Sequence, residues 1–412
     1  MRRNSFRRFL LDALPVLVPA ALVLFWVAHE SYQMDFRAFF VAGKSCLENL
    51  DPYWNHADLG PEFRDSLNGR PGSRFSYPPF AALAFLPVAT LPYVVAKQFF
   101  SVLLGVAFLV VAYLSAEDLE PPPREAVFVA ALSMPVLTTF ERGQVDLLLV
   151  AAVLAAWRLS GSRRSLAAAV LVALAGAVKI IPLALAGLWV AHRRLLLTSL
   201  LALVSLSLWL LPIPILGEEA YRSFFSQLTS VSAPPSASPS LISLRDFVGV
   251  FSPDGVGLTV MEDETRLILR YDLPGKFVHR VNPLARVGPA ACLAAGVVLM
   301  TYFSWRTRRL GAMPQLFATL PALNVLNPMS WTMGLVWFLP FFLSRYARAT
   351  WIGRLALLVP LFLPGSLTVR GFGFEAAASL VVVVIFLLAE ERRGTWSGLV
   401  VAPGDRPSPL AH

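Results

Sequence analysis

The chain has 412 residues, of which 56% are hydrophobic and only 15% are charged. Its mean hydropathy of +0.63 excludes an ordinary soluble domain and predicts a polytopic membrane protein. The net charge of +9 does not indicate a nucleic-acid-binding protein, because Arg and Lys fall in short clusters between apolar runs. No nucleic acid is therefore expected among the partners.

Apolar runs recur along the whole chain and predict an all-α fold with about twelve membrane segments. Several runs are shorter than the roughly 20 residues of a straight crossing, so we expect some helices to be short, broken or tilted. The first run follows a basic N-terminus and has no clean cleavage site, and it is expected to be an uncleaved first span. The runs lie near residues 11–29, 97–116, 126–140, 144–159, 166–178, 181–191, 195–215, 286–304, 312–326, 331–345, 352–365 and 376–389.

The basic clusters predict the orientation, because Lys and Arg in short loops favour the cytoplasmic side. They place the N-terminus inside and most inner loops at Arg-rich turns, although the loop 117–125 holds four acids and one Arg. The long loops 30–96 and 216–285 are then extracytoplasmic, and the proline-containing stretch 80–92 is expected to lie along the outer interface. Residues 1–393 are expected to form one transmembrane domain, and residues 394–412 a disordered cytoplasmic tail.

The acid that follows the first span is the first candidate for chemistry. Asp35 is expected at the boundary between water and lipid, where partial desolvation can raise its proton affinity. It could act as a general base toward a hydroxyl, or it could be an interfacial acid paired with Arg37 or a helix terminus. Arg37 and Lys44 could contact an anionic group or form a solvated rim.

Two further polar positions lie in or beside the outer loops. Tyr77, in the Tyr-Pro-Pro sequence, begins the interfacial stretch, and its neighbouring prolines fix an extended entry. Glu141, Arg142, Gln144 and Asp146 come together at one turn, where they either line a wet, carbohydrate-binding cavity or satisfy one another, as Glu141 with Arg142 could.

Lys179 stands out because an isolated ammonium between two apolar stretches is costly. If Pro182 breaks the helix, Lys179 lies at an outer turn and can face a phosphate; the alternative is that it snorkels to the interface. In the later half, Asn327 and Trp331 mark another polar turn, and Trp331 could belong to the interfacial aromatic belt. Arg245 is either a second anion contact or the partner of the neighbouring Asp246.

Several motifs of other enzyme classes are absent from the sequence. There is no Walker-type phosphate loop, no His-Glu-x-x-His, no Asp-x-Asp pair in the outer loops and no Gly-x-Ser-x-Gly. The two cysteines show no metal-ligand spacing. A soluble nucleotide donor, ATP-driven chemistry and a resident cofactor are therefore not expected, and metal dependence is left open.

An ordered set of short motifs resembles the bacterial polyprenol-phosphate-mannose-dependent alpha-1,2-mannosyltransferases, a family of the superfamily C (GT-C) membrane glycosyltransferases. The resemblance covers residues 30 to about 335. Two positions depart from the family pattern: Asp146 stands where Asn is common, and Thr-Met-Gly follows Trp331 where His is often found. The motifs are Met34-Asp35-Phe36, Asp51-Pro52-Tyr53, Phe75-Ser76-Tyr77-Pro78-Pro79, Gly143-Gln144-Val145-Asp146, Lys179-Ile180-Ile181-Pro182 and Asn327-Pro328-Met329-Ser330-Trp331.

The resemblance implies a multi-pass enzyme of the bacterial cytoplasmic membrane, with cytoplasmic termini and an extracytoplasmic active site. Its donor would be a polyprenyl-phosphate sugar and its acceptor a glycan or glycolipid. Asp35 corresponds by position to the catalytic base, and Lys179 to the basic site of the Lys-x-x-Pro motif. In the expected inverting reaction, Arg37, Lys179 or Arg245 stabilises the phosphate. The leaving group is already ionic, so this mechanism does not itself require a metal.

Two other function classes are compatible with the same residues. A transporter or flippase would use Lys179 and the outer acids as a binding pathway, but the sequence has no internal repeat and its long outer loops suit an enzyme better. A non-catalytic assembly subunit would use the outer loops only to hold a glycan.

Overall fold

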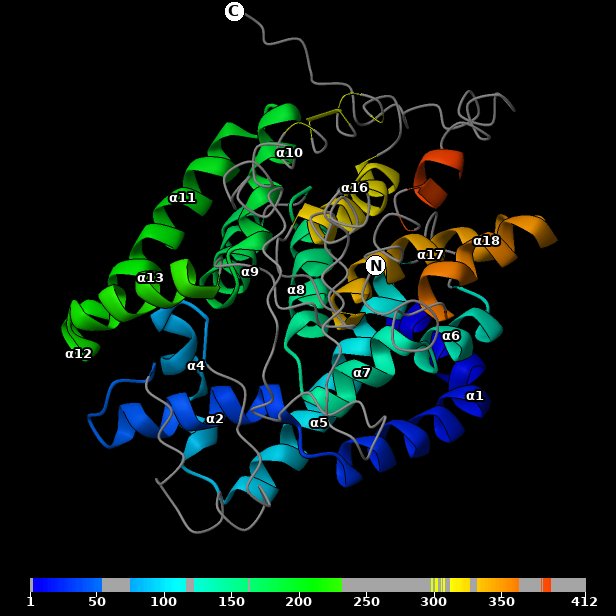
Figure 1. Ribbon diagram of the computed structural model, residues 1–412. Coiled ribbons are helices and arrows are strands. Elements are labelled where there is room, and N and C mark those ends of the chain that lie inside the picture. The colour runs from blue at the N-terminus through cyan, green and yellow to red at the C-terminus, as the bar shows by residue number, and fades with distance from the viewer. Residues whose placement is uncertain are drawn as a thin grey trace, which may run out of the picture.

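The computed structural model describes residues 3–53, 75–115, 122–161, 164–231, 312–326, 332–362 and 381–386, together with the single positions 298, 305, 307 and 379 and the pair 301–302. Every regular element in these ranges is a helix (Figure 1), so the predicted all-α class is confirmed there. The elements are α1 (Arg3–Glu30), α2 (Met34–Leu47), α4 (Pro79–Ala89), α5 (Tyr93–Leu114), α6 (Arg124–Ala131), α7 (Met134–Arg142), α8 (Asp146–Leu159), α9 (Ser165–Val178), η1 (Ile181–Ala184), α10 (Leu185–Ala191), α11 (Leu195–Leu210), α12 (Ile213–Leu216), α13 (Glu219–Val231), α16 (Ala312–Leu326), η3 (Thr332–Phe338), α17 (Leu339–Arg345), η4 (Tyr346–Arg348) and α18 (Trp351–Phe362).

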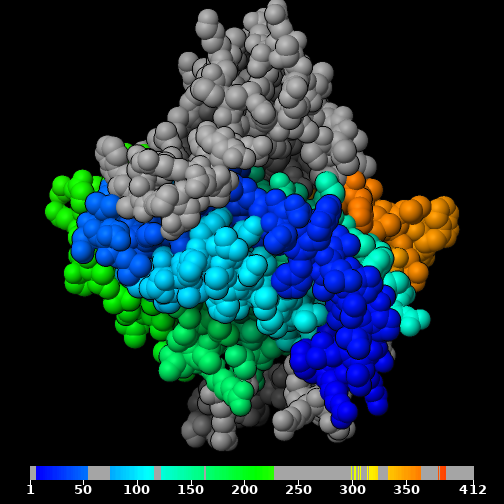
Figure 2. Space-filling view, turned by 90° about the horizontal axis from the view of Figure 1, so that it is seen from below, coloured from blue at the N-terminus to red at the C-terminus, as the bar shows by residue number. Residues whose placement is uncertain are grey.

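Three stretches in the described ranges are long and apolar enough to cross a membrane: Phe6–Glu30, Tyr93–Leu114 and Leu195–Leu216. They leave large apolar side chains exposed, such as Leu22 at 69% and Leu196 at 72%, and α1 and α5 lie on the face shown in Figure 2. Such surfaces are unfavourable in water and suit lipid. The predicted membrane class is supported, whereas the predicted count of about twelve crossings is not confirmed.

Proline explains why several predicted runs are broken. The run 126–140 is split into α6 and α7, and Pro135 occupies the start of α7. Pro182 is the second residue of the short 3-10 helix η1 ahead of α10, and Pro212 lies between α11 and α12. A proline lacks the N–H that would continue the preceding helix, but it fits the first helical turn. The expectation of short and broken helices is confirmed for these runs.

The stretch expected at the outer interface forms α4, which has 11 residues. At about 1.5 Å per residue it is too short to cross a bilayer. Helix α4 packs closely on α2: a Cβ added to Gly43 would lie 3.0 Å from the backbone carbonyl of Phe85. The rings of Phe39 and Phe85 stack with centroids 4.5 Å apart across the same contact. This packing fixes α2, and with it the first candidate acid, against the body of the protein.

Hydrogen bonds join several helix ends at one end of the bundle. The Lys97 ammonium, near the start of α5, donates to the carbonyls of His29 (2.9 Å) and Ser31 (3.0 Å) at the end of α1. The Gln33 amide, just before α2, donates to the carbonyl of Phe140 in α7 at 3.0 Å. Helix ends carry unsatisfied backbone groups, so this end of the bundle is a natural place for polar side chains.

The opposite end of the bundle is fixed by arginines. The Arg158 guanidinium, in the last turn of α8, donates to the carbonyl of Leu114 at the end of α5 at 3.1 Å. The Arg194 guanidinium, just before α11, donates to the hydroxyl of Ser160 at the end of α8. In the described chain, the candidate acids Asp35 and Asp146 therefore lie at the end of the bundle away from Arg158 and Arg194.

Candidate active site

The turn that precedes α2 holds Asp35 in place. Gln33 adopts a left-handed backbone conformation (φ 47°) and precedes the first residue of α2. Its side chain is fully buried, and its amide donates to the hydroxyl of Ser101 at 2.9 Å as well as to Phe140. The start of α2 is thereby anchored to α5 and α7, and Asp35, the second residue of the helix, cannot shift without breaking these contacts.

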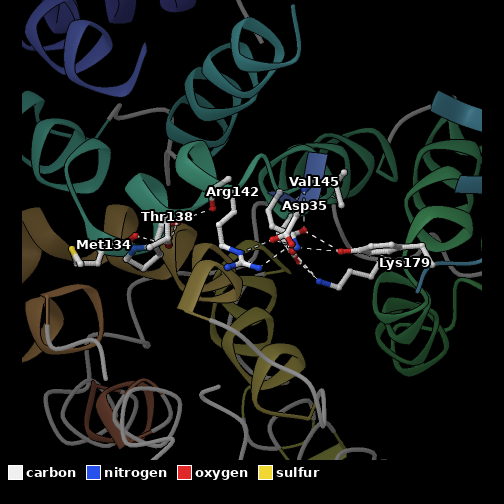
Figure 3. A network of polar contacts seen from close by, with 11 residues as sticks. Asp35, Met134, Thr138, Arg142, Val145 and Lys179 are labelled. Atoms are coloured by element: carbon white, nitrogen blue, oxygen red, sulfur yellow. Dashed lines mark hydrogen bonds and ion pairs between the residues drawn. The ribbon is translucent and has the colours of Figure 1, made fainter. Parts of the chain in front are cut away.

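Asp35 forms a two-point ion pair with Arg142, from the last turn of α7 (Figure 3). Arg142 Nε lies 2.7 Å from Oδ2 of Asp35, and Nη2 lies 3.0 Å from Oδ1. The amide of Gln144 donates to the same Oδ2 at 3.0 Å. Asp35 is only 4% exposed. Paired arginine N–H groups match a carboxylate geometrically, so the carboxylate is held in one orientation.

The turn that brings Arg142 and Gln144 to Asp35 depends on Gly143. This residue ends α7 with φ 68°, a left-handed conformation that side chains disfavour. A Cβ at Gly143 would lie 2.4 Å from the Cβ of Phe36. The tight turn and the close approach of α2 therefore both need glycine, and together they place two donors on one carboxylate.

A second ion pair joins Asp146 and Lys179. The Lys179 ammonium lies 2.9 Å from Oδ1 and 2.8 Å from Oδ2 of Asp146. Asp146 is the first residue of α8, where a negative charge is favoured by the helix dipole, and Lys179 directly follows the end of α9. The indole of Trp337, in η3, donates to Oδ1 of Asp146 at 3.0 Å. The expected helix break next to Lys179 is observed.

Tyr77 lies between the two ion pairs. The Gln144 amide donates to the Tyr77 hydroxyl at 3.1 Å, so Gln144 bridges Tyr77 and Asp35. The hydroxyl of Tyr53 donates to the backbone carbonyl of Tyr77 at 2.7 Å. Burial raises the pKa of Tyr77 above its ordinary value of 10, and the nearby carboxylates of Asp35 and Asp146 raise it further. The phenol therefore stays neutral at physiological pH.

Six of the residues singled out in the sequence share this network: Asp35, Tyr77, Arg142, Gln144, Asp146 and Lys179. In Figure 3, Arg142 and Lys179 reach toward the centre of the network from opposite sides. The arrangement combines a buried carboxylate, two cations and a neutral phenol within one group of helix ends. It offers a fixed proton acceptor near positive charge, the combination that transfer of a group from an anionic leaving group needs.

Other singled-out residues lie elsewhere. Arg37 is buried in α2 at 2% exposure, and its guanidinium carbon lies 5.5 Å from the centroid of the Tyr32 ring. The partner of Asp35 is thus Arg142 and not Arg37. Glu141 is exposed, and Arg142 pairs with Asp35 in its place. Arg245, Asn327 and Trp331 lie outside the described residues.

Sequence reasoning missed two supporting residues: Trp337, which contacts Asp146, and Gln33, which anchors the turn before Asp35. Gln33 could have been noticed as a polar side chain directly before Asp35 at a helix end. Trp337 gave no signal, because it lies inside an apolar run where an aromatic residue is expected in the core. Among the residues that the structure describes, no group of three or more His, Cys, Asp or Glu side chains is placed to hold a metal ion.

Fold and site together define an all-helical membrane protein with a buried network of paired charges between helix ends. The chain belongs to glycosyltransferase family 87, whose sequence profile matches residues 75–328. The family resemblance noted in the sequence is confirmed, and with it the glycosyltransferase class. The matched range contains five of the six network residues, whereas Asp35 precedes it.

One characterised relative is similar over most of the chain. It is the "polyprenol-phosphate-mannose-dependent alpha-(1-2)-phosphatidylinositol pentamannoside mannosyltransferase" of Mycolicibacterium smegmatis (strain ATCC 700084 / mc(2)155), which is 29% identical over 325 residues. The alignment covers 73% of this chain and 66% of the relative, so the chain spans about two thirds of that protein. No solved structure gives a significant match.

Proposed function

We propose that this protein transfers a sugar, mannose, from a polyprenyl-phosphate donor to a glycan or glycolipid acceptor. The reaction takes place on the extracytoplasmic side of a bacterial cytoplasmic membrane and inverts the anomeric centre, and Asp35 is the general base. Family membership supports the reaction class. The choice of donor is supported by the relative from M. smegmatis, whose name describes it as polyprenol-phosphate-mannose-dependent.

The single observation that carries this proposal is that Arg142 and Gln144 hold the carboxylate of Asp35 in one orientation. In the described part of the chain, its Oδ2 accepts hydrogen bonds from both Arg142 and Gln144, whereas Oδ1 accepts one, from Arg142. A carboxylate oxygen has two lone pairs. Oδ1 is therefore the oxygen that can accept the proton of an acceptor hydroxyl.

The proposed step balances without a further reactant. The acceptor O–H gives its proton to Oδ1 of Asp35, and its oxygen attacks the anomeric carbon. The bond between that carbon and the donor phosphate oxygen breaks on the opposite face, and its electron pair leaves with the polyprenyl phosphate. Lys179, whose side chain is 20% exposed against 14% for that of Arg142, stabilises the negative charge on the phosphate. No step requires a metal, because the leaving group is anionic from the start.

Sidedness is inferred from charge. Arg158 and Arg194 fix the end of the bundle that lies away from Asp35, and further arginines stand next to these positions in the sequence. Basic residues of membrane proteins concentrate on the cytoplasmic side. The end of the bundle that carries the Asp35 network is then extracytoplasmic, where a lipid-linked donor presents its sugar.

The proposal is tested with the purified full chain in lipid nanodiscs, polyprenyl phosphomannose and a panel of glycolipid acceptors. We expect mannosyl transfer by the wild type and a loss of at least about 100-fold in Asp35→Asn, within the range by which general bases contribute. The product should have inverted anomeric configuration. Wild-type turnover in Asp35→Asn would reject the assignment of Asp35 as the general base. Flux of the donor across sealed vesicles without sugar transfer would favour a transporter instead.

A further inference from the structure

Trp337 is a buried residue that makes a polar contact, and the proposed reaction does not use this contact. The residue lies in η3, is 1% exposed, and its indole N–H donates to Oδ1 of Asp146 at 3.0 Å. Helix η3 packs against both α7 and α8, the two helices whose ends supply Arg142 and Asp146. Trp337 lies beyond the range 75–328 that matches the family.

The indole of Trp337 orients the carboxylate of Asp146, which Lys179 alone would not hold in one orientation. An ammonium is a compact point charge on a flexible stem and accepts many carboxylate geometries. The indole N–H is a single donor on a rigid ring. Because Trp337 donates to Oδ1 while Lys179 contacts both oxygens, the carboxylate of Asp146, itself 1% exposed, is fixed in one rotation.

Lys179 is the member of this chain of contacts that reaches solvent. Its side chain is 20% exposed, against 2% for that of Asp146. Within the described residues, its ammonium hydrogen bonds only to the two oxygens of Asp146. An ammonium has three N–H donors, so at least one is left for an anion that arrives from the exposed side.

We propose that Trp337 and Asp146 are positioning residues that hold the Lys179 ammonium in place for the phosphate of the lipid donor. This inference rests on the proposed function and adds a specific division of labour to it. The contacts among Trp337, Asp146 and Lys179 determine how strongly the phosphate is bound. The contacts among Arg142, Gln144 and Asp35 determine the proton transfer. Loss of the indole N–H should therefore weaken phosphate recognition without changing the pH dependence of turnover.

The test uses Trp337→Phe, which removes the N–H and keeps an aromatic ring. Its matched control is Trp189→Phe in α10. Trp189 is also fully buried, it stacks on Trp157 with centroids 6.5 Å apart, and its indole N–H has no hydrogen-bond partner among the described residues. Both substitutions remove the same atoms from a buried site, but only one of them removes a hydrogen bond to a carboxylate.

Two inhibitors of the transfer reaction are compared, a polyprenyl phosphate and the polyprenol of the same chain length. Their ratio of inhibition constants isolates what the phosphate contributes to binding. We expect Trp337→Phe to reduce that ratio about fivefold, in line with the loss of one modest hydrogen bond, and to raise KM for the donor with the pH profile of turnover unchanged. Trp189→Phe should leave the ratio at the wild-type value.

Equal weakening of both inhibitors by Trp337→Phe would overturn the inference, because it indicates general damage to the site. A ratio of inhibition constants like that of Trp189→Phe would also overturn it, because it shows that the hydrogen bond has no effect on phosphate binding. If Trp337→Phe does not fold, Asp146→Asn gives the same readout, since it removes the charge that holds Lys179. A wild type that binds polyprenyl phosphate no better than polyprenol, or transfers no sugar, contradicts the proposed function itself. If the wild type and Trp337→Phe prefer polyprenyl phosphate over polyprenol by the same ratio, only the positioning role is contradicted.

Discussion

Arg142 holds both carboxylate oxygens of Asp35 at 2.7 and 3.0 Å, although 107 residues separate the two in the chain. The contact joins the first turn of α2 to the last turn of α7, two helix ends that meet at one end of the bundle. This half-buried arginine facing a buried acid has two consequences. It orients the acid, and it makes the acid depend on a distant turn for its position.

We expect Arg142→Lys to lower kcat strongly with a smaller change in KM. Lysine keeps the charge but replaces two parallel N–H donors with one point charge, so the carboxylate of Asp35 is free to rotate. A displacement of about 1 Å in a reacting group can cost about 100-fold in rate, and we expect a loss of 10- to 100-fold. Steady-state kinetics with varied donor and acceptor measure it.

The control for this substitution is Arg222→Lys. Arg222 also contacts two carboxylates, those of Glu218 and Glu219, but its side chain is 66% exposed. Exposed ion pairs contribute little, so Arg222→Lys should keep wild-type kinetics and stability. Arg142→Lys with wild-type kcat would show that orientation of Asp35 by the guanidinium is not needed.

Gly143→Ala should destabilise the protein and reduce activity together. The residue has φ 68°, which costs a non-glycine residue about 1–2 kcal/mol. The added Cβ would also lie 2.4 Å from the Cβ of Phe36, in contact with α2. We expect a lower Tm in thermal unfolding and a larger loss of transfer, because the turn carries Arg142 and Gln144.

Gly187→Ala, within α10, is the corresponding control. A Cβ there meets no atom within 4 Å, and alanine is the better helix former by about 1 kcal/mol. Its Tm should equal or exceed that of the wild type. If Gly143→Ala behaves like Gly187→Ala, the turn does not depend on glycine.

Tyr77→Phe should lower turnover about three- to tenfold without changing the shape of the pH profile. The hydroxyl accepts a hydrogen bond from Gln144, which in turn donates to Asp35, and one such contact contributes about 1 kcal/mol. Burial, with Asp35 and Asp146 nearby, raises the pKa of Tyr77, so the phenol stays protonated up to at least its ordinary value of 10. Rates measured from pH 5 to 9.5 should be displaced uniformly. An alkaline limb that disappears in Tyr77→Phe would contradict this.

Most residues of the polar network could be singled out from the sequence, but the partner of each residue could not. Asp35 and Lys179 were noticeable because isolated charges beside apolar runs are costly, and Pro182 correctly indicated the break after α9. The partners could not be predicted, since Arg37 is close to Asp35 in sequence whereas Arg142 reaches it only through the packing of α2 on α7. Local spacing favours neighbours, and tertiary contacts decide among distant residues.

The helix boundaries show the same limit. Apolar composition located the segments, because the bilayer selects for it, but it did not separate α6 from α7, whose break at Leu132 and Ser133 lies within one apolar run. Trp337 was hidden for a related reason: an aromatic residue in an apolar run is normally part of the core, and its N–H partner, Asp146, lies 191 residues earlier.

The ion pair of Asp146 and Lys179 offers a way to separate stability from function. Removal of one member of a buried pair leaves the other without its partner at a cost of roughly 3–5 kcal/mol, whereas replacement of both often has little effect. We therefore expect Lys179→Met to lower Tm, because Asp146 is 1% exposed and retains, among the residues that the structure describes, only the indole of Trp337 as a side-chain partner. The double variant Asp146→Asn/Lys179→Met should recover most of that loss in Tm, as its two neutral side chains need no counter-charge.

The transfer activity of the double variant should stay as low as that of Lys179→Met, since the cation for the phosphate is still missing. Thermal unfolding and donor kinetics on the same nanodisc samples distinguish the two effects, and recovery of activity along with Tm would assign Lys179 a purely structural role.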